Sequence, residues 1–523
     1  MKSYKRSLLV FLIIFLIFFV AYYYFNKINS RYDGKFNIQN RFVSHRKAYS
    51  ALGNIVSIIN KSYINIQTSF VIVNGFENLI DSVSTEDITT EKYKLVAVRG
   101  TIPNEICELI KNCDKVQFVE NYEEIVSLLK NNQMILGLLP FEIVDFRVKI
   151  LAFNNISIWE GRSEYQLKAY QIFESFNPKY NSQSTFDPSK IVRVGHTGSF
   201  IPARGVMLHT RKFFNGNLEP MIEPMKGYFS RFDILSATQE ISLLGSGVYC
   251  DSCMSFVGSE NEISEMLLPL GVDIVTMAAN HVLDGGYQAL GNTLDKLKEN
   301  NIKVIGASTE NNEKALEPIL VEKKGLKIAY IAFNDTPGIE QWATNQKGGA
   351  ASLSDWIIEG SETVLYQPNV DRVKRVMAKA KNLNPDYIII LPHWGGVEYQ
   401  NIPTSYVTNL ANLLIQEGAD IIIGDHPHWI QKIEWHNNNE KSYAGLKQSP
   451  IFYSVGNFIF DQMWSYETRV GMSVELIFYE KNLKAINISF HKLNLYDKGT
   501  INQIDDKNEI EQLLKNIFEI SEL

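Results

Sequence analysis

The chain has 523 residues, of which 45% are hydrophobic and 12% aromatic, and its 51 basic and 58 acidic residues give a formal net charge of −7. This balance excludes a chain built to neutralise nucleic-acid phosphates, which needs a net basic face. The apolar content excludes a disordered chain. At about 150 residues per domain, the length allows roughly two to four domains.

The first predicted element is a membrane anchor. An unbroken run of apolar and tyrosine residues, 8–25, follows three cations, Lys2, Lys5 and Arg6. As a helix at about 1.5 Å per residue, this run is nearly as long as the bilayer core is thick. A cleaved signal peptide is the alternative, but its apolar run is usually shorter and ends in small residues, whereas this one ends in aromatics. We therefore expect residues 1–29 to be a single-pass anchor in the cell membrane and residues 30–523 to lie outside the cytoplasm.

Four cysteines form two local pairs in the sequence, Cys107 with Cys113 and Cys250 with Cys253. Disulfides are permitted outside the cytoplasm, and free buried thiols are the alternative. Only the second pair has Cys-x-x-Cys spacing, which disfavours a zinc ribbon.

Two soluble domains are predicted beyond the anchor, divided near residue 185 by a stretch rich in Pro, Asn and Ser at 177–189. Residues 30–185 are expected to form a small α/β domain of unknown role. Its predicted elements are short strands at 94–98 and 134–139 and a helix at 122–130.

Apolar strands alternate with amphipathic helices through residues 186–523, which predicts a layered α/β sheet. Strands are predicted at 191–194, 273–277, 303–305, 327–333, 386–391, 419–423 and 451–455, and helices at 287–300, 370–383 and 405–417. Two consecutive strands at 471–478 and 483–490 and a helix at 508–518 follow. The glycine-bearing segments 195–198, 245–247 and 258–259 match neither a P-loop nor a nucleophile elbow and are expected to be turns.

Polar residues gather where several of these strands end, which is where open α/β sheets hold their sites. The loops read Ala279-Asn-His-Val-Leu-Asp-Gly285, His393-Trp-Gly-Gly-Val-Glu-Tyr399, Gly424-Asp-His-Pro-His428 and Gly456-Asn-Phe-Ile-Phe-Asp461. Imidazole nitrogens together with Asn and carboxylate oxygens suit Zn, Mn or Fe. The loops therefore predict a divalent-metal site of one or two ions, of the kind used in two-metal hydrolysis. A purely structural role for the histidines is the alternative.

Taken in this order, the motifs resemble the CapA family of capsule and poly-gamma-glutamate synthesis proteins, which have a calcineurin-like metallophosphoesterase fold. The resemblance covers about residues 191–465 and includes Ile201-Pro-Ala-Arg-Gly-Val206. It implies a layered α/β/β/α domain and a function in capsule or poly-gamma-glutamate synthesis. The implied partners are an anionic envelope polymer or its precursor and other membrane proteins of polymer synthesis.

Position by position, the resemblance implies metal ligands at Glu240, Asn280, His393, His426 and His428. It also implies that His281 is a general acid for the leaving oxygen, with Asp284 orienting its imidazole. Arg204 has two candidate roles, contact with an anionic substrate group and a salt bridge to a local carboxylate.

Two departures from the family pattern favour an alternative function. Ser199 stands where the family has an aspartate ligand, and Thr238-Gln-Glu240 replaces Asn-Leu-Glu. His196 is a candidate substitute for the lost ligand. The chain is thus expected to be either a metal-dependent phosphoesterase-type hydrolase or a non-catalytic component that binds the polymer or scaffolds a synthase.

Overall fold

The computed structural model describes residues 70–519, apart from 79, 91, 102–112, 131, 156, 161–185, 249–254, 337, 360–362 and 439–441. These residues belong to one compact unit, Thr68–Leu523. The predicted anchor at 8–25 lies outside the described residues. So do three of the four cysteines, Cys107, Cys250 and Cys253. Within the described ranges, no helix is both long and apolar enough to cross a bilayer.

A five-stranded mixed sheet forms the N-terminal part, with strand order β4-β3-β5-β1-β6. Its strands are β1 (Phe70–Gly75), β3 (Lys94–Val98), β4 (Val116–Val119), β5 (Ile135–Pro140) and β6 (Val148–Ile150). Two short strands, β2 (Ser82–Val83) and β7 (Ala152–Phe153), pair beside it, and the helices are α3 (Thr85–Thr89) and α5 (Tyr122–Leu129). The strands predicted at 94–98 and 134–139 and the helix at 122–130 are confirmed. The domain division near residue 185 stays a prediction.

The first large sheet has eight strands in the order β13-β12-β9-β8-β25-β26-β27, with β24 beside β8. They are β8 (Ile191–Phe200), β9 (Ile234–Gln239), β12 (Ile274–Thr276), β13 (Lys303–Ile305), β24 (Asn457–Ile459), β25 (Val470–Tyr479), β26 (Asn482–Leu493) and β27 (Ile501–Gln503). The accompanying helices are α7 (Gly205–Phe213), α8 (Glu219–Ile222), α9 (Lys226–Phe229), α10 (Leu268–Leu270), α11 (Gly286–Glu299) and α15 (Lys507–Glu519).

The second large sheet has six strands in the order β15-β16-β20-β21-β23-β22. They are β15 (Ile319–Lys323), β16 (Leu326–Asp335), β20 (Tyr387–Trp394), β21 (Ile421–Ile423), β22 (Ile433–Asn437) and β23 (Gln448–Phe452), with helices α12 (Asn312–Ala315), α13 (Val370–Asn382) and α14 (Ser405–Gln416). Three strand pairs complete the fold: β10 (Ser242–Leu243) with β11 (Val257–Gly258), β14 (Ala307–Ser308) with β17 (Gly349–Ala350), and β18 (Ser354–Glu359) with β19 (Thr363–Pro368).

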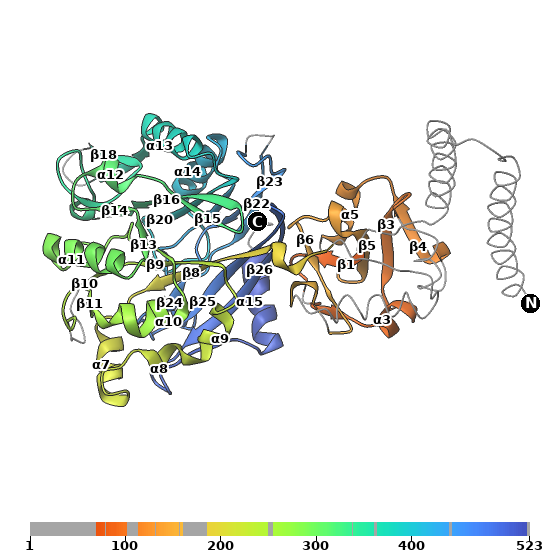
Figure 1. Cartoon of the computed structure of the whole chain (residues 1–523), viewed down its shortest axis with the longest axis horizontal. Coiled ribbons are helices and arrows are strands. Elements are labelled where there is room, and N and C mark those ends of the chain that lie inside the picture. Colours follow the sequence, from red (N-terminus) through yellow and green to blue (C-terminus); the bar gives the residue numbers. More distant parts are fainter. Residues whose placement is uncertain are drawn as a thin grey trace, which may run out of the picture. The chain divides into compact units, whose positions relative to one another are not determined.

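The two large sheets pack face to face and helices cover their outer faces (Figure 1). Alternation along the strands produces these layers, because successive side chains point to opposite faces. On β20, Ile389 lies in the core shared by both sheets, whereas Ile388 and Ile390 pack under the outer helices. On β12, Ile274 and Val275 divide in the same way. The described fold is therefore the α/β/β/α arrangement that the family resemblance implies.

Local sequence sets the helices that cover the second sheet. Helix α13 begins after Asn369, whose side chain accepts a hydrogen bond from the Arg372 amide at 2.9 Å. Its buried residues recur at helical spacing, at Val373, Val376, Met377 and Ala380. The apolar side of the helix is buried against the sheet.

The first large sheet corrects two expectations. Strand β8 runs through Gly195 and Gly198, which were predicted in a turn. A Cβ on Gly198 would lie 1.9 Å from the Gly456 carbonyl oxygen, so glycine here allows close backbone approach rather than a turn. Strand β9 was not predicted, because its buried sequence, Ile234-Leu-Ser-Ala-Thr-Gln239, is half polar.

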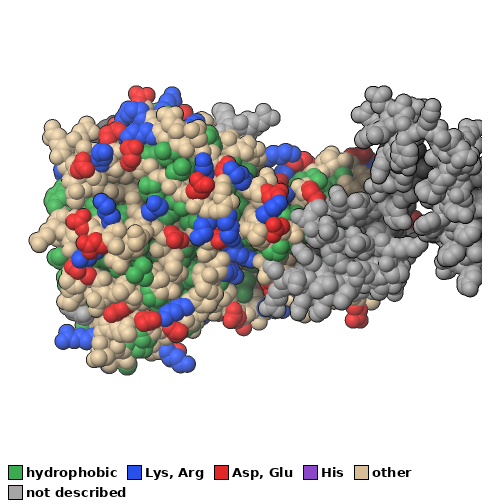
Figure 2. Space-filling model, viewed as in Figure 1, with side chains coloured by type: hydrophobic (Ala, Val, Ile, Leu, Met, Phe, Trp, Pro, Cys, Tyr) green, Lys and Arg blue, Asp and Glu red, His purple; other side chains and the backbone are tan. Residues whose placement is uncertain are grey.

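On the face shown in Figure 2, the surface of the described part has no large area of one charge sign. Basic and acidic side chains are interspersed there, with small apolar areas between them. On this face, strong recognition of a charged polymer would therefore need a local site.

Candidate metal-binding site

Parallel strands bring the predicted ligands to one edge of the two sheets. Glu240 directly follows β9, and Asn280 follows β12. His393 lies near the end of β20, and both His426 and His428 follow β21. Two backbone bridges tie the loops together, between Ile241 and His281 and between His393 and Asp425.

His393 is the centre of the cluster. Its Nε2 lies 2.9 Å from Oδ1 of Asn280 and 3.8 Å from Oε2 of Glu240. Its ring centroid is 4.9 Å from that of His426. His393 is 1% exposed and Glu240 0%. Three residues that are far apart in sequence thus present cation-binding atoms to one another in a place removed from water.

His428 is oriented by Asn457, which lies in a predicted site loop but was not predicted as a site residue. Its Nδ1 lies 2.8 Å from Oδ1 of Asn457. Because an amide oxygen only accepts, Nδ1 carries the proton and Nε2 keeps its lone pair for a ligand. The rings of His426 and His428 are 6.2 Å apart.

The backbone at both of these histidines is unusual. His426 has φ of 101° and His428 has φ of 58°, in the region that L-residues rarely adopt. Such conformations persist only where the surrounding structure requires them, and they concentrate at functional sites.

The protonation states of the cluster also favour a cation. Burial raises the pKa of Glu240 to about 7, although the nearby His428 and the Ser199 hydroxyl act in the opposite direction. Neither carboxylate oxygen of Glu240 has a partner at hydrogen-bonding distance and angle among the described residues. Burial lowers the pKa of His393 and of His426 well below the usual value, and neighbouring histidines lower both further. The His393 and His426 imidazoles are therefore neutral at neutral pH, which is the form that binds metal.

The donor set fits a divalent ion in its chemistry. A carboxylate buried without a hydrogen bond or a counter-ion is costly, and a cation would remove that cost. Imidazole, amide and carboxylate donors suit Zn, Mn or Fe. The described residues contain no group of three or more His, Cys, Asp or Glu side chains already gathered to hold a metal. The fit therefore rests on the unsatisfied Glu240 carboxylate beside His393 and Asn280.

His281 and Asp284 form the pair that the sequence predicts. The His281 Nδ1 lies 2.9 Å from Oδ2 of Asp284. Asp284 also accepts hydrogen bonds from the Phe256 amide at 2.9 Å and from Nε2 of Gln341 at 3.1 Å. The Gln341 Oε1 in turn accepts from the Leu283 amide at 2.6 Å. No sequence motif indicated Gln341, which comes from a distant loop.

Of the two roles predicted for Arg204, the structure contains the salt bridge to a local carboxylate. Its Nε and Nη2 nitrogens lie 3.1 and 2.5 Å from the two carboxylate oxygens of Asp461. The guanidinium also lies over the ring of Phe256, at 4.3 Å from its centroid. Phe256 meets the His281 ring edge-to-face at 4.2 Å. Arg204 is therefore linked to His281 through one aromatic ring.

Ser199, which departs from the family pattern, and His196, its candidate substitute, are both buried in strand β8. Ser199 is 1% exposed and lies between Thr238 of β9 and Asn457 of β24. His196 has its Nδ1 2.9 Å from the Ser236 hydroxyl, and burial lowers the pKa of His196 to about 3.

Two carboxylates beside the histidines were quoted in motifs but not predicted as site residues. Asp425 is 2% exposed, and its Oδ2 accepts a hydrogen bond from the Thr238 hydroxyl and lies 3.9 Å from Nε2 of His196. Glu398 has its Oε1 4.0 Å from Nε2 of His426. In the sequence, the only indication that Asp425 or Glu398 belongs to the site is its position within or beside a histidine motif.

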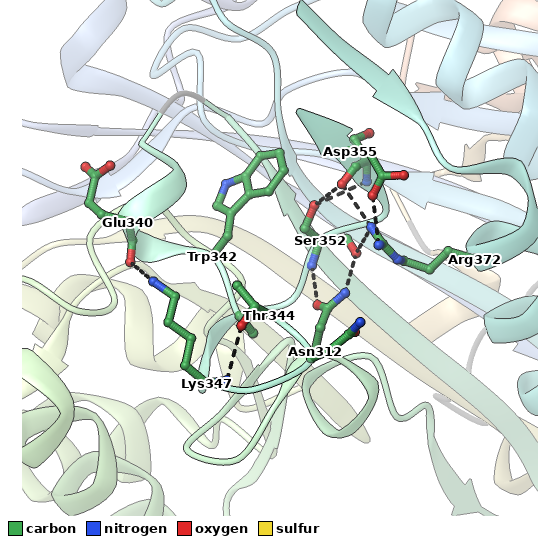
Figure 3. Close-up of a pocket in the computed structure, with 11 residues that line it drawn as sticks. Asn312, Glu340, Trp342, Thr344, Lys347, Ser352, Asp355 and Arg372 are labelled. Atoms are coloured by element: carbon green, nitrogen blue, oxygen red, sulfur yellow. Dashed lines mark hydrogen bonds and ion pairs between the residues drawn. The ribbon is translucent and has the colours of Figure 1, made fainter. Parts of the chain in front are cut away.

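A cavity of about 510 Å³ was not predicted at all, and none of these histidines lines it. Two interactions join groups of its lining: the Asn312 amide binds the backbone of Ser352, and Arg372 pairs with Asp355 at 2.9 Å (Figure 3). The loop that carries Glu340 and Trp342 in its wall also carries Gln341, which holds Asp284.

The family model and the related sequences that match this chain point to the same family. The family model of the bacterial capsule synthesis protein PGA_cap matches residues 195–462, which is just over half of the chain. The "Capsule biosynthesis protein CapA" of Bacillus anthracis is 29% identical over 212 residues, covering 40% of this chain and 45% of that protein. The "PGA biosynthesis protein CapA" of Bacillus subtilis (strain 168) is 28% identical over 207 residues, covering 40% and 47%. The chain spans about half the length of the curated relatives it matches.

Among solved structures, the calcineurin-like phosphoesterase YfkN from Bacillus subtilis aligns with a TM-score of 0.34 and 13% identity, over 64% of this chain and 99% of that chain. The 5'-nucleotidase precursor from Thermus thermophilus aligns with a TM-score of 0.33 and 14% identity, over 64% and 59%. Because the family model covers the strands and loops that carry Glu240, Asn280, His393, His426 and His428, the chain belongs to the PGA_cap family of bacterial capsule synthesis proteins.

Proposed function

We propose that this chain is a membrane-anchored protein of capsule or poly-gamma-glutamate synthesis with a metal-dependent phosphoesterase-type site. The observation that carries the hydrolase part is the buried Glu240 carboxylate, whose Oε2 lies 3.8 Å from Nε2 of His393. Among the described residues, neither of its oxygens has a partner at hydrogen-bonding distance and angle. A folded chain keeps such a group where a cation offsets it.

The proposed ligands of one or two divalent ions, Mn, Zn or Fe, are Glu240, Asn280, His393, His426 and His428. A bound divalent ion supplies Lewis acidity and a more acidic water. Asn457 fixes the tautomer of His428 so that Nε2 faces the site as a lone pair.

His281 is the proposed general acid. Asp284 holds its Nδ1, so the proton that reaches the leaving oxygen comes from Nε2. Asp284 is itself held by Gln341 and by the Phe256 amide, which fixes the direction of the imidazole. Arg204 acts in this proposal by holding Asp461 and covering Phe256, while a direct contact with an anionic substrate group stays a prediction.

The setting is proposed from the sequence and the relatives. The apolar run at 8–25 supports anchoring in the cell membrane with the remainder outside the cytoplasm. The printed names of the Bacillus relatives, capsule and PGA biosynthesis proteins, support an envelope polymer or its precursor as the substrate. Other membrane proteins of polymer synthesis are the proposed partners.

Metal analysis combined with phosphodiester hydrolysis tests the hydrolase. The purified full chain is expected to retain Mn or Zn and to hydrolyse bis-p-nitrophenyl phosphate, and His393→Ala is expected to lose both properties. The matched control is His436→Ala, since His436 lies on β22, where its imidazole faces Glu434 at 3.3 Å. A wild-type chain that neither binds metal nor hydrolyses the diester would overturn the proposal.

A non-catalytic role is the second candidate, and the buried Ser199 favours it. A neutral hydroxyl stands where the family has a charged ligand, so the site loses a charge. A chain that binds metal but hydrolyses no diester, and a His281→Ala variant that supports normal polymer production in the producing cell, would together favour a binding or scaffolding component.

A further inference from the structure

The second large sheet brings a carboxylate to the neighbourhood of Ser199. Asp425 follows β21 and is joined to His393 by a backbone bridge. Its Oδ2 accepts a hydrogen bond from the hydroxyl of Thr238, which lies on β9 in the first large sheet. Thr238 is the register partner of Ser199 on β8. The Asp425 side chain therefore crosses from one sheet to the other and ends close to the position where the family pattern has an aspartate.

An imidazole of the first large sheet faces the same carboxylate. Nε2 of His196 lies 3.9 Å from Oδ2 of Asp425, which is too long for a hydrogen bond. Nδ1 of His196 lies 2.9 Å from the Ser236 hydroxyl, which donates its one hydrogen to the Gly195 carbonyl at 3.0 Å. That hydroxyl therefore accepts a hydrogen bond from Nδ1. Because burial lowers the pKa of His196 to about 3, the imidazole is neutral and Nε2 keeps its lone pair.

Asp425 and His196 are both buried with polar atoms left over. Each residue is 2% exposed. Among the described residues, Oδ1 of Asp425 and Nε2 of His196 have no partner at hydrogen-bonding distance and angle. Burying such atoms without a partner is costly, and a cation between the two side chains would remove that cost. A carboxylate oxygen and an imidazole nitrogen are donors that suit Mn and Zn.

We propose that Asp425 and His196 form a second cation position of the candidate metal-binding site, in which the Asp425 carboxylate supplies the charge that Ser199 lacks. The inference rests on the proposed function, which assigns the first ion to the group around Glu240 and His393. A ligand missing from the first large sheet is then replaced by one from the second. The departure at Ser199 therefore costs the site a ligand from β8 without costing it the second ion.

Calorimetric titration with MnCl2 counts the ions. The purified full chain is stripped with EDTA and dialysed before the titration, and the wild type is expected to bind two Mn ions per chain. Asp425→Asn keeps the shape of the side chain and an acceptor for Thr238. This variant and His196→Gln are each expected to keep one ion and to bind the second about tenfold more weakly or not at all.

The matched control is Asp335→Asn, which also changes a fully buried carboxylate, but one that three hydroxyls already bind. It is expected to bind both ions as the wild type does. The double variant Ser199→Asp with Asp425→Asn is expected to regain the second ion, because it returns a carboxylate to β8. Thermal unfolding in EDTA checks the fold of each variant.

A crystal of the wild type soaked in ZnCl2 gives a test that needs no variant. A zinc peak in the anomalous map is expected at about 2.0–2.2 Å from a carboxylate oxygen of Asp425. Zinc at Glu240 and His393 with no peak at bonding distance from Asp425 would overturn the inference.

The titration separates this inference from the proposed function. Equal Mn binding by the wild type and Asp425→Asn overturns the inference, and a double variant that stays at one ion contradicts the replacement of the missing charge by Asp425. A single ion that His393→Ala loses and Asp425→Asn keeps overturns the second position alone, whereas a wild type that binds no ion overturns both proposals. Two ions without hydrolysis of bis-p-nitrophenyl phosphate support the inference and remove the hydrolase.

Discussion

Glu240 and Asp335 are both fully buried carboxylates at the ends of strands, Glu240 after β9 and Asp335 as the last residue of β16. Asp335 accepts hydrogen bonds from three hydroxyls, at 2.5, 2.8 and 3.2 Å, those of Ser354, Tyr406 and Ser352. In the described residues, neither oxygen of Glu240 has a partner at hydrogen-bonding distance and angle, although the nearby Ser199 hydroxyl acts to lower its pKa. Both occupy comparable places in their sheets, and only their neighbours differ.

This difference separates a structural carboxylate from a functional one. Asp335 joins three segments of chain and has its hydrogen-bonding capacity met, so its burial is already compensated. Glu240 faces His393 and Asn280, whose polar atoms also favour a cation. Burial alone is thus a weak indicator of function, and burial without partners is a stronger one.

The largest expected effect concerns catalysis at the candidate metal-binding site, to which Glu240 belongs. His281→Ala is expected to lower kcat for a phosphodiester by about a thousandfold, because the general acid is lost. His436→Ala is the control and is expected to have wild-type kcat. Steady-state kinetics at saturating Mn or Zn measures both, and a kcat for His281→Ala within a few-fold of wild type would remove the general-acid assignment.

Stability tests the comparison directly. Asp335→Ala is expected to reduce the free energy of unfolding by about 3 kcal/mol, because buried hydroxyls lose their acceptor. Glu240→Gln, measured in EDTA, is expected to leave the free energy of unfolding unchanged or raise it, since an uncompensated buried charge disappears. Urea unfolding gives both values, and equal losses for the two variants would mean that the two carboxylates do not differ in kind.

Metal addition is expected to stabilise the protein through the unsatisfied carboxylate. At a free metal concentration about 100 times Kd, linkage predicts about 2.7 kcal/mol of added stability. Glu240→Gln is expected to lose most of this increment, and Asp335→Asn is expected to keep it. Thermal unfolding with and without Mn or Zn measures the increment, and the reverse pattern would place the metal elsewhere.

The effect that is smallest over a single pH unit is a pH dependence at a second hydrogen-bonded carboxylate, Asp420. It accepts hydrogen bonds at 2.7 Å from the Ile388 amide, the Ser442 hydroxyl and the Ala444 amide, yet burial raises its pKa from 3.8 to about 6. Between these values the folded chain binds more protons than the unfolded chain, so the free energy of unfolding falls as pH rises, by at most about 1.4 kcal/mol per pH unit.

Asp420→Asn is expected to remove that slope. Urea unfolding of the variant and the wild type at intervals from about pH 4 to pH 6.5 measures the difference. A wild type whose stability instead rises relative to the variant across this window would show that the hydrogen bonds, and not burial, control Asp420.

The sequence by itself determined the layers and the loops of the site. Alternating strands and amphipathic helices predicted a layered α/β sheet, and the rule that parallel strands meet at their carboxyl ends predicted that Asn280, His393 and the His426 loop would converge. Both predictions depend on local periodicity and on short spacing, which one stretch of chain carries within itself.

Only the tertiary structure decided which polar groups are compensated. Strand β9, which delivers Glu240, is too polar for a periodicity rule to find. Gln341 supports Asp284 across 57 residues and Asp461 pairs with Arg204 across 257. Hydrogen bonding and desolvation depend on whichever distant atoms the fold brings near. Whether a buried carboxylate is structural, like Asp335, or open to a cation, like Glu240, is therefore fixed by long-range contacts that no local pattern encodes.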